Sequence, residues 1–568
     1  MHLLPQPLRQ QRQEQPQTAA PVIIDFNDTR TSYSCFTTPQ LLRAWLVLRV
    51  CGWRPLVANA ERLLRLGYRV FGHTVVDAVI RQTFFKHFCA GETAGEVGAR
   101  VRQLQALGVN GIFDYAAEAE VAAEETPPAS TSSAAASTSG ARTVVARQYS
   151  YDGEALCDAR AGVFLECIRA VRDQSPGGIA AIKMTALSDP LLLTRASACI
   201  VELKRLFHRL DEGATGKITP EQFEQGYRRL FRCETAADRA QFEDLVEQLA
   251  VGGVRARTDC IDYVDWSNRI DIEDLARISN ACREEGPFFR AALALDADAL
   301  QLLRNMRRRV GALADAARDC GVRFMIDAEQ VRDCGVRLMI DAEQAHDCGL
   351  RLMINAEQTV TQPVIDNLVC SLQREYNVMD DARAPTIYGT YQCYLKDTPQ
   401  RLADDLERAR RGNYAFACKL VRGAYMEAER ARAAAAHTPS PVCDTLDATH
   451  ANYTRATDLV LAHMGAGHRA EVMFATHNQA SVERALAAMA ALSVERGVAF
   501  GQLLGMSDHL TFALGARGYA AFKYLPYGRV AEVVPYLLRR ARENSALLGG
   551  ATHERALLLR EVRRRMLG

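Results

Sequence analysis

The chain has 568 residues, a formal net charge of +1 and 24% charged residues, so no bulk field indicates a nucleic acid partner. A chain of this length can bury a large core, either in about two to four domains or in one large barrel. Its 16 cysteines form no CxxC pairs, and no uncharged apolar run reaches the roughly eighteen residues of a spanning helix, which argues against a disulfide scaffold and an integral membrane protein.

The first part of the chain predicts a helical region followed by a strand. Residues 1–20 carry two arginines against one acid, a composition compatible with a transit segment. The apolar spacing of residues 21–108 predicts an N-terminal helical region. The apolar run at 109–116 then predicts a strand, the first element of a segment spanning 109–199. Within that segment, residues 121–147 are rich in Ala, Ser, Thr and Pro, which predicts a disordered linker.

Residues 200–285 predict a helical insertion that resembles an EF-hand pair. The segment from Asp211 has the glycine and apolar spacing of a calcium loop, but its third position is Gly213 and its twelfth is Gln222. A hard cation needs oxygen ligands and usually a bidentate acid at these positions. A second candidate loop has Val254 at its first ligand position. We therefore interpret the insertion as EF-hand-like and without a metal site.

A tandem repeat at 319–358 lies near the start of the segment 286–550. Its copies read DCGVRFMIDAEQ, DCGVRLMIDAEQ and DCGLRLMINAEQ and begin at residues 319, 333 and 347. Because only one copy can occupy a given strand, the others must be looped out. We expect the third copy to form the strand, since it keeps the short connection to the helix that follows. The first and second copies remain alternatives.

Five further apolar runs, each followed by a stretch rich in Ala, Leu, Arg and Glu, predict strand–helix units after the repeat. They span residues 385–395, 414–425, 471–478, 498–506 and 520–528. With 109–116, 178–187 and one repeat copy they make eight units, the number in a closed barrel. The sequence therefore predicts an α/β fold: a (β/α)8 TIM-type barrel with N-terminal helices, a helical insertion and a basic C-terminal helix at 551–568.

Polar residues end most of the predicted strands. They are Asp114, Lys183, Gln392, Lys419, Arg422, Thr476, His477, Asn478 and Tyr524. Functional residues of such barrels gather at the carboxyl ends of the strands, so we expect one shared site there. For any single residue, the alternative is an ordinary polar group with structural partners. No GxGxxG follows a strand, so a dinucleotide would have to bind on the barrel itself.

The stretch 519–548 predicts a site for a small carboxylate. A strand ending near Tyr524 is followed by a helix on which Arg539 and Glu543 share a face, with Arg540 beside them. Planar guanidinium groups offer paired donors that fit two carboxylate oxygens. The alternative is an exposed helix face with an ordinary ion pair.

Motifs that recur in a fixed order resemble the proline dehydrogenase family, the flavin enzymes that begin proline catabolism. They read IAAIKMTAL, MIDAEQ, TYQCYLKD, KLVRGAYMEAER, ATHN, FGQLLGM, KYLPYG and PYLLRRARENS, with VIIDFND and TFFKHFCAGET nearer the N-terminus. The EF-hand-like insertion and the absence of a fused aldehyde dehydrogenase make the chain similar to eukaryotic mitochondrial members.

The resemblance implies a distorted (β/α)8 barrel that holds FAD noncovalently at the carboxyl ends of its strands. It implies oxidation of L-proline to 1-pyrroline-5-carboxylate by hydride transfer to the flavin. The electrons would pass to a membrane quinone, which implies peripheral association with the matrix side of the inner mitochondrial membrane. No nucleic acid partner is expected.

The resemblance also implies roles for individual residues. Arg539 and Arg540 would bind the substrate carboxylate, Glu543 and Lys183 would support them, Tyr524 and Leu503 would wall the proline ring, and Tyr425 would help close the site. Gln392, Lys419, Arg422, Thr476, His477 and Asn478 match positions that contact the flavin.

One position departs from the family pattern. The third strand of the family ends in an Asp within DAEQ, whereas the third repeat copy has Asn355 there. If this copy forms the strand, a carboxylate is lost from the site. The first and second copies keep Asp327 and Asp341, so the acid would survive if either of them forms the strand.

Three alternatives remain open from the sequence. Hydroxyproline dehydrogenases typically carry a smaller residue where Tyr524 stands, so Tyr524 favours proline. The insertion and Asn355 leave room for a catalytically impaired or calcium-responsive regulator. The basic, apolar tail 554–568 can form an interfacial membrane helix or a helix packed on the barrel.

Overall fold

The computed structural model describes residues 24–115, 151, 153–175, 177–249, 260–279, 282, 295–326, 358–379, 384–423, 425–546 and 548–567. The predicted transit segment 1–20 and linker 121–147 lie outside these residues. So do the second repeat copy and nearly all of the third, including Asn355.

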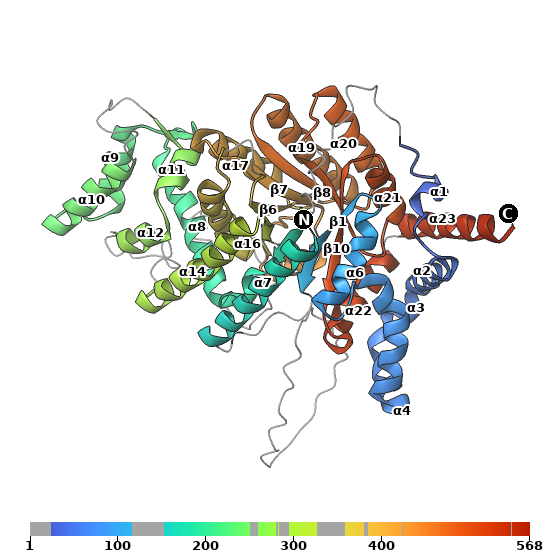
Figure 1. Ribbon diagram of the computed structural model, residues 1–568. Coiled ribbons are helices and arrows are strands. Elements are labelled where there is room, and N and C mark those ends of the chain that lie inside the picture. Colours follow the sequence, from blue (N-terminus) through green and yellow to red (C-terminus); the bar gives the residue numbers. More distant parts are fainter. Residues whose placement is uncertain are drawn as a thin grey trace, which may run out of the picture.

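Eight parallel strands close into a barrel at the centre of the molecule (Figure 1). They are β1 (Val109–Tyr115), β2 (Ile179–Ile182), β5 (Arg323–Ile326), β6 (Ile387–Gln392), β7 (Phe416–Val421), β8 (Ala470–Ala475), β9 (Val498–Leu503) and β10 (Ala520–Tyr527). The order around the barrel is β1-β10-β9-β8-β7-β6-β5-β2. The predicted (β/α)8 architecture is confirmed, and each of the eight predicted runs contributes one strand.

Helices between the strands form the outer layer of the barrel. They are α6 (Ala94–Gln105), α7 (Glu154–Gln174), the short 3-10 turn η2 (Met184–Ala186), α8 (Pro190–Leu210), α14 (Ala297–Asp319), α16 (Gln358–Tyr376), α17 (Thr398–Gly412), α18 (Met426–Ala435), α19 (Leu446–Gly465), α20 (Gln479–Ala491), α21 (Asp508–Ala516) and α22 (Val530–Ala546). Local chemistry sets several starts: Asp189 accepts a hydrogen bond from the Leu191 amide (2.9 Å), and Pro190 takes the first position of α8. The predicted domain boundary at residue 200 therefore falls inside α8.

The inside of the barrel is filled by side chains from every strand. One buried cluster holds Ile112, Ile179, Ala181, Met325, Tyr388, Ala417, Met473 and Phe522, with Ala499 and Tyr524 packed against it. At the amino-terminal end, the Tyr388 hydroxyl bonds Glu471, whose Oε2 lies 3.5 Å from Arg323 Nε. These polar side chains fill the amino-terminal end of the barrel, and a site is therefore expected at the carboxyl end of the strands.

The first repeat copy, and not the third, forms the third barrel strand. β5 is Arg323–Ile326 and pairs with β2 and β6, so our expectation for the third copy is wrong. The first copy differs from the other two at a core position. Its Phe324 is fully buried, and the other copies have leucine at the corresponding position. α14 also runs directly into this copy through a turn at Gly321, whose φ is +63°. The residue after β5 in the sequence is the acid Asp327.

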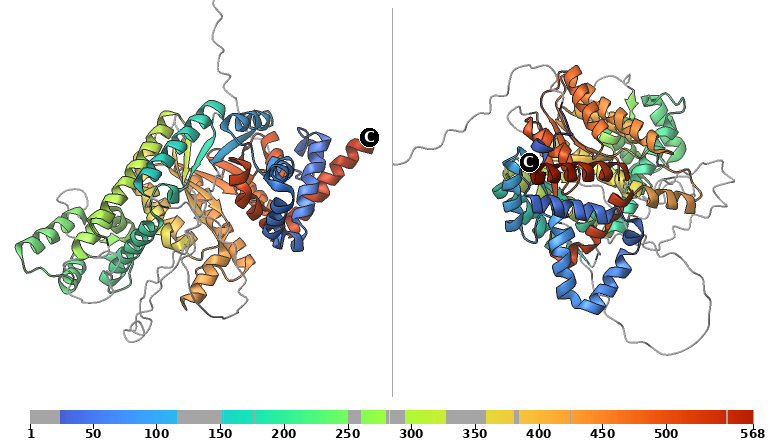
Figure 2. Two further views of the ribbon diagram at one scale, coloured as in Figure 1. Left: turned by 90° about the horizontal axis from the view of Figure 1, so that it is seen from below. Right: turned by 90° about the vertical axis from the view of Figure 1, so that its right-hand side faces the viewer.

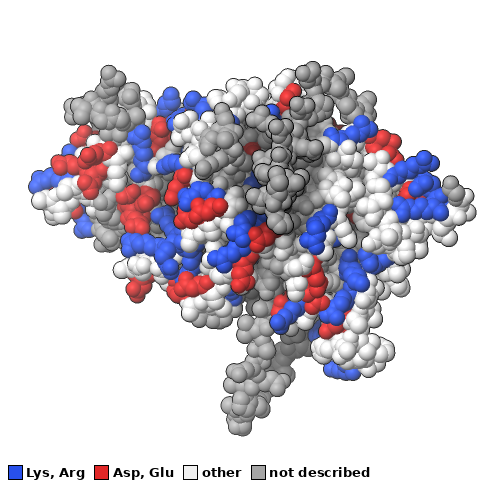
Figure 3. Space-filling model, viewed as in Figure 1, with Lys and Arg blue, Asp and Glu red and all other residues white. Residues whose placement is uncertain are grey.

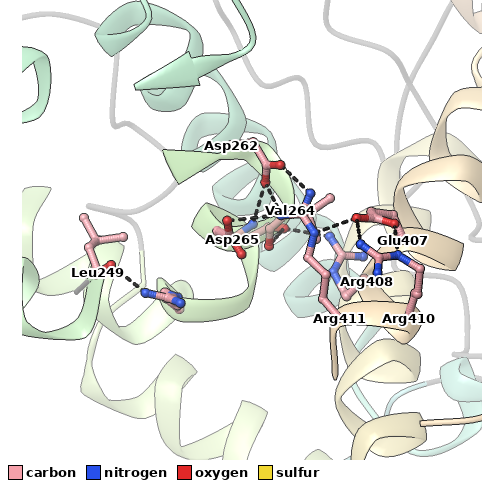
Figure 4. Close-up of polar contacts among 10 residues, drawn as sticks. Leu249, Asp262, Val264, Asp265, Glu407, Arg408, Arg410 and Arg411 are labelled. Atoms are coloured by element: carbon pink, nitrogen blue, oxygen red, sulfur yellow. Dashed lines mark hydrogen bonds and ion pairs between the residues drawn. The ribbon is translucent and has the colours of Figure 1, made fainter. Parts of the chain in front are cut away.

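The insertion is helical, as predicted, and contains a small sheet. Its elements are β3 (Lys217–Ile218), α9 (Pro220–Leu230), α10 (Ala236–Leu249), β4 (Ile261–Asp262), α11 (Tyr263–Arg269) and α12 (Ile272–Ser279), with β3 and β4 antiparallel. Arg411 of α17 anchors it to the barrel through Asp262 (2.6 Å) and Asp265 (3.1 Å), and Glu407 of the same helix holds the Arg411 guanidinium in place (2.7 Å), as Figure 4 shows. Its assignment as EF-hand-like stays a prediction.

N-terminal helices and the C-terminal helix lie together on one side of the barrel (Figure 2). They are α1 (Thr29–Ser32), α2 (Thr38–Cys51), α3 (Arg54–Ala58), α4 (Ala60–Ile80), the π-helical turn η1 (Arg81–Phe85), α5 (Lys86–Phe88) and α23 (Leu548–Leu567). Leu557, Leu558 and Val562 of α23 pack against Leu41 and Leu48 of α2. These three residues of the tail are therefore buried against α2, whereas Met566 and Leu567 are 71% and 86% exposed, and both alternatives for 554–568 stay predictions. Within the described residues, no helix is both long and apolar enough to cross a bilayer.

Candidate active site

Six of the predicted residues lie at strand ends on the inner side of the barrel, because strand side chains alternate between two faces. Ile112, Ala181, Ala417 and Phe522 belong to the interior cluster. The positions two residues beyond these are Asp114, Lys183, Lys419 and Tyr524, so they point to the same inner side at the carboxyl end. Gln392 and Leu503 stand four residues beyond the cluster members Tyr388 and Ala499. The same spacing in β5 leads from Met325 to Asp327, which lies outside the described residues.

Two of these residues form an ion pair across neighbouring strands. Lys183 Nζ lies 3.6 Å from Asp114 Oδ1, and the side chains are only 15% and 5% exposed. Partial burial strengthens such a pair relative to a surface pair, because less water screens it. The pair fixes the position of a lysine ammonium at the mouth, beside β1 and β2.

Arg422, directly after β7, is held in a network that also includes the residues after β8. Its three nitrogens donate to His450 Nδ1 (3.0 Å), Thr476 Oγ1 (2.7 Å) and Ser481 Oγ (2.8 Å), and its guanidinium lies 4.4 Å from the centre of the Tyr453 ring. Thr476 and the N-cap Asn478 thus belong to one rigid unit with Arg422. The unit offers a fixed positive charge to an anionic group.

Gln392 is a buried residue at the end of β6 with a donor that faces no acceptor in the described part of the chain. The residue is 2% exposed, and among the described residues its Nε2 has no hydrogen-bond partner. Beside it, Gly423 has a φ of +107°, and a Cβ there would lie 1.8 Å from the Tyr394 ring and 3.1 Å from Gln392 Oε1. An unsatisfied buried amide is costly, so this arrangement fits a polar group brought by a ligand.

His477, the middle residue of the Thr-His-Asn segment, is held as a neutral ring. Its Nδ1 lies 3.1 Å from Ser507 Oγ. Burial first, and then the charges of Lys523 and Arg540, lower the pKa of His477 to about 3. A neutral imidazole can donate or accept a hydrogen bond at physiological pH without adding charge to the mouth.

A buried polar cluster supports this region from behind the barrel wall. Lys523 is fully buried, and its Nζ donates to Met506 O (2.7 Å) and pairs with Asp508 Oδ1 (2.7 Å). Glu554 of α23 accepts hydrogen bonds from the amides of Ser507 (2.9 Å) and Asp508 (3.0 Å). Ser507 has a φ of +51°, which is uncommon for serine, so Glu554 stabilises a strained turn next to His477.

The paired arginines lie on α22, close to the carboxyl end of β9. Leu503 packs against the cluster that contains Val533, Leu537 and other residues of α22. Arg540 is 8% exposed and Arg539 is half-buried, so the alternative of an exposed helix face is wrong for Arg540. The guanidinium groups of Arg539 and Arg540 lie 5.8 and 5.1 Å, respectively, from the centre of the Tyr536 ring.

The remaining predicted residues divide into placed and undescribed ones. Leu503 and Tyr524 are partners in the β9–β10 ladder, and both are half-buried at the mouth. Tyr425 precedes the first residue of α18. Glu543 lies on α22, but its side chain is outside the described part of the structure, and Asn355 is outside it altogether.

Sequence reasoning missed the residues that support the site. These are His450, Ser481, Ser507, Asp508 and Glu554. Each lies on a helix or loop behind the strands, where a single charged or hydroxyl residue has no motif of its own. Lys523 was visible as a polar residue inside an apolar strand, and that signal could have identified a buried ion pair.

Taken together, the mouth presents a set of basic groups, one of which pairs with Asp114. The basic residues are Lys183, Lys419, Arg422, Arg539 and Arg540. Lys419 and Arg422 lie on the β7–β8 side, and the two arginines of α22 lie near β9. Such an arrangement can bind anionic groups, such as phosphates or a carboxylate, at two places around one mouth.

The chain is similar to known proteins over most of its length. A family model described as proline dehydrogenase matches residues 336–552, beginning within the second repeat copy. The mitochondrial proline dehydrogenase 1 of Homo sapiens is 35% identical over 582 residues, covering 96% of this chain and 90% of the relative. The hydroxyproline dehydrogenase of Bos taurus is 30% identical, covering 93% and 91%.

Among solved structures, the proline utilization A protein (PutA) of Bdellovibrio bacteriovorus inactivated by N-propargylglycine matches with a TM-score of 0.48 and 14% identity, over 92% of this chain and 38% of that one. The chain spans well under half of this bacterial protein. The relatives at 30–35% identity, in contrast, match this chain over nearly its full length. The chain therefore belongs to the proline dehydrogenase family of oxidoreductases.

Proposed function

We propose that this protein oxidises L-proline to 1-pyrroline-5-carboxylate with FAD bound at the mouth of the barrel, and that the electron pair leaves to a membrane quinone. The observation that carries the proposal is the meeting of basic groups from β2, β7 and α22 at one barrel mouth. Family membership supports proline as the class of substrate. The mitochondrial names of the relatives support a mitochondrial location, within which we propose the matrix side of the inner membrane.

The residues between β6 and β8 fit FAD. The buried Nε2 of Gln392 would donate to the cofactor, and Lys419 and Arg422 would face its anionic parts. Thr476, His477 and Asn478 would complete this side, since the Arg422 network holds Thr476 and Asn478 and the Ser507 hydroxyl holds His477. A bound flavin supplies the hydride acceptor that no side chain of the protein can provide.

The opposite side of the mouth fits the amino acid. Arg539 and Arg540 would bind the proline carboxylate, because a buried carboxylate needs several permanently charged donors. Lys183 and Glu543 would support them. Tyr524 and Leu503 would wall the apolar ring, and Tyr425 would help close the site. The residue that follows β5 in the site would be the acid Asp327 and not Asn355, because the first repeat copy forms β5.

An absorbance spectrum of the purified full chain tests the proposal. We expect a flavin spectrum that is bleached when L-proline is added anaerobically and that returns with a quinone analogue. A colourless protein that cannot be loaded with FAD, or a flavin spectrum that proline leaves unchanged, would overturn it.

Hydroxyproline dehydrogenase is the second candidate, because those enzymes cover this chain almost as fully as the proline enzymes do. The large side chain of Tyr524 at the mouth favours proline, since a ring hydroxyl needs space there. Turnover with L-proline and with trans-4-hydroxy-L-proline decides between the two. Faster turnover of hydroxyproline would reverse our choice.

A calcium-responsive or catalytically impaired regulator is the third candidate. The loss of a carboxylate at Asn355 no longer favours it, because that copy does not form the strand. Calcium binding by the insertion would have to compete with the hydrogen bonds that Asp211 already accepts from Thr215 and Gly216 (2.9 and 2.7 Å).

A further inference from the structure

An apolar stripe runs along the solvent side of α4. Leu63, Leu66 and Val70 follow one another at spacings of three and four residues, so they share one face of the helix. They are 47%, 57% and 61% exposed. After the bend in this helix, Val75 and Val79 are four residues apart and are 52% and 59% exposed. Exposed apolar surface of this kind marks a site of interaction.

A basic stripe lies beside the apolar one. Arg62, Arg65 and Arg69 each precede a residue of the apolar stripe and repeat with the same spacing, so they form a parallel row about 100° round the helix. All three are exposed. In Figure 3, uncharged side chains with Lys and Arg next to them cover the projection where α4 lies in Figure 1.

The bend makes α4 a preformed hairpin. Gly72 has φ +74° and ψ 166°, a conformation that side chains other than glycine rarely adopt. The Tyr68 hydroxyl bonds Asp77 (3.0 Å), and the Tyr68 ring stacks on His73 (4.4 Å), so the two arms are tied together. Phe71 stands at the bend and is 65% exposed.

The inner side of the hairpin packs on the helix that carries the paired arginines. Leu64, Val76 and Ile80 join one apolar cluster with Val533 and other residues of α22. Glu61 at the start of α4 pairs with Arg542 of α22 (2.8 Å). The hairpin therefore lies directly behind the substrate side of the mouth, with its apolar stripe turned to solvent.

We propose that this hairpin docks the protein on an anionic lipid bilayer. Leu63, Leu66, Val70 and Phe71 enter the interface, and the row of arginines contacts lipid phosphates. A second copy of the chain fits less well, because a two-fold contact through this face would bring its own arginines together. The docking itself does not depend on the proposed function. Its use in electron transfer does rest on that function, because a bilayer here would place its quinone close to α22.

Vesicle flotation of the full chain tests the docking surface without any turnover. With vesicles of phosphatidylcholine and cardiolipin, we expect Val70→Glu with Phe71→Glu to lower the partition coefficient by about 100-fold. Replacing Arg62, Arg65 and Arg69 by Gln should cost roughly five-fold per arginine on anionic vesicles and little on neutral ones.

Leu446→Glu is the matched control, because Leu446 is 67% exposed and begins α19, a helix that Figure 1 shows well apart from α4. It should float like the unaltered chain. Equal flotation of the double variant, or no flotation of the unaltered chain, would overturn the proposal. So would a double variant that floats normally but loses a dimer seen by sedimentation, since the face would then be an interface between copies.

Activity readouts separate this proposal from the proposed function. The double variant should oxidise proline with a water-soluble acceptor at the unaltered rate, and should lose turnover only with a quinone held in vesicles. If the unaltered chain oxidises no proline but floats through the hairpin, the proposed function fails and the docking surface stands.

Discussion

The barrel mouth and the helical insertion both collect charged residues, but they use them differently. In the insertion, Asp262 and Asp265 form ion pairs with the guanidinium of Arg411. Asp211 accepts hydrogen bonds from backbone amides of its own loop. At the mouth, the buried Nε2 of Gln392 has no partner among the described residues, and Lys183, Lys419 and Arg422 bring positive charge.

This difference suggests that the mouth is suited to bind a ligand, whereas the acidic groups of the insertion already have partners within the protein. Burial raises and the donors of Arg411 lower the pKa of Asp262, with a net lowering, so its charge is already neutralised by the chain. A calcium ion would have to displace that guanidinium. The mouth, in contrast, gains by receiving an anionic ligand with hydrogen-bond acceptors.

The largest expected effect is at Arg540. Arg540→Met should lower kcat/KM for L-proline by about 10²–10³-fold, mainly through KM, because roughly 3–4 kcal/mol is lost when a buried carboxylate loses a charged donor. Steady-state kinetics of the FAD-loaded enzyme measure it. Arg542→Met on the same helix removes only the pair with Glu61 and should change kcat/KM little. Equal losses in both variants would mean that Arg540 acts through helix packing.

The next effect concerns Glu554, behind the mouth. Burial first, and then the charge of Asp508, raise the pKa of Glu554 to about 7. A carboxyl with a raised pKa stabilises the fold below its unfolded value of about 4.5 and loses that contribution as pH rises through 7. Between these values, the free energy of unfolding of the unaltered protein should fall by about 1–3 kcal/mol relative to Glu554→Gln.

Glu561, on the same helix, is the control of opposite sign. Hydrogen bonds from Arg564 lower its pKa to about 2, so its contribution is present above about pH 4.5 and is lost as pH falls toward 2. Denaturant titrations of Glu561→Gln across this range should therefore show the reverse trend. Parallel pH curves for Glu554→Gln and the unaltered protein would refute the assignment at Glu554.

The sequence predicted the barrel because strand periodicity and turn signals are local, and each of the eight runs carries both. It could not identify the copy that forms β5, because three near-identical copies have the same pattern. In the fold, Phe324 of the first copy is buried and this copy follows α14 directly, neither of which a repeated local pattern can reveal. Glu554 was also invisible, since its partners Ser507 and Asp508 are distant in sequence and meet it only in the fold.

A smaller effect is expected at Gln392, where stability and cofactor binding should change in opposite directions. Gln392→Leu removes a buried amide without a partner, so the FAD-free protein should keep its stability or gain about 1 kcal/mol. FAD should bind about tenfold more weakly, since one hydrogen bond is lost. Thermal unfolding of the FAD-free protein and flavin titration measure the two quantities. A clear loss of stability without FAD would show that Gln392 serves the fold and not the cofactor.

The smallest effect should be at Arg411, in the region that the chain fills itself. Arg411→Ala leaves Asp262 and Asp265 facing each other, and because these groups are about a quarter exposed, we expect a loss of only about 1 kcal/mol in stability. Proline turnover at 25 °C should not change, since the insertion is distant from the mouth. Millimolar calcium should raise the melting temperature of this variant and not that of the unaltered protein, because only in the variant do Asp262 and Asp265 lack the guanidinium of Arg411. If calcium stabilises both equally, Arg411 does not take the place of a metal, and the contrast between the two regions fails at this point.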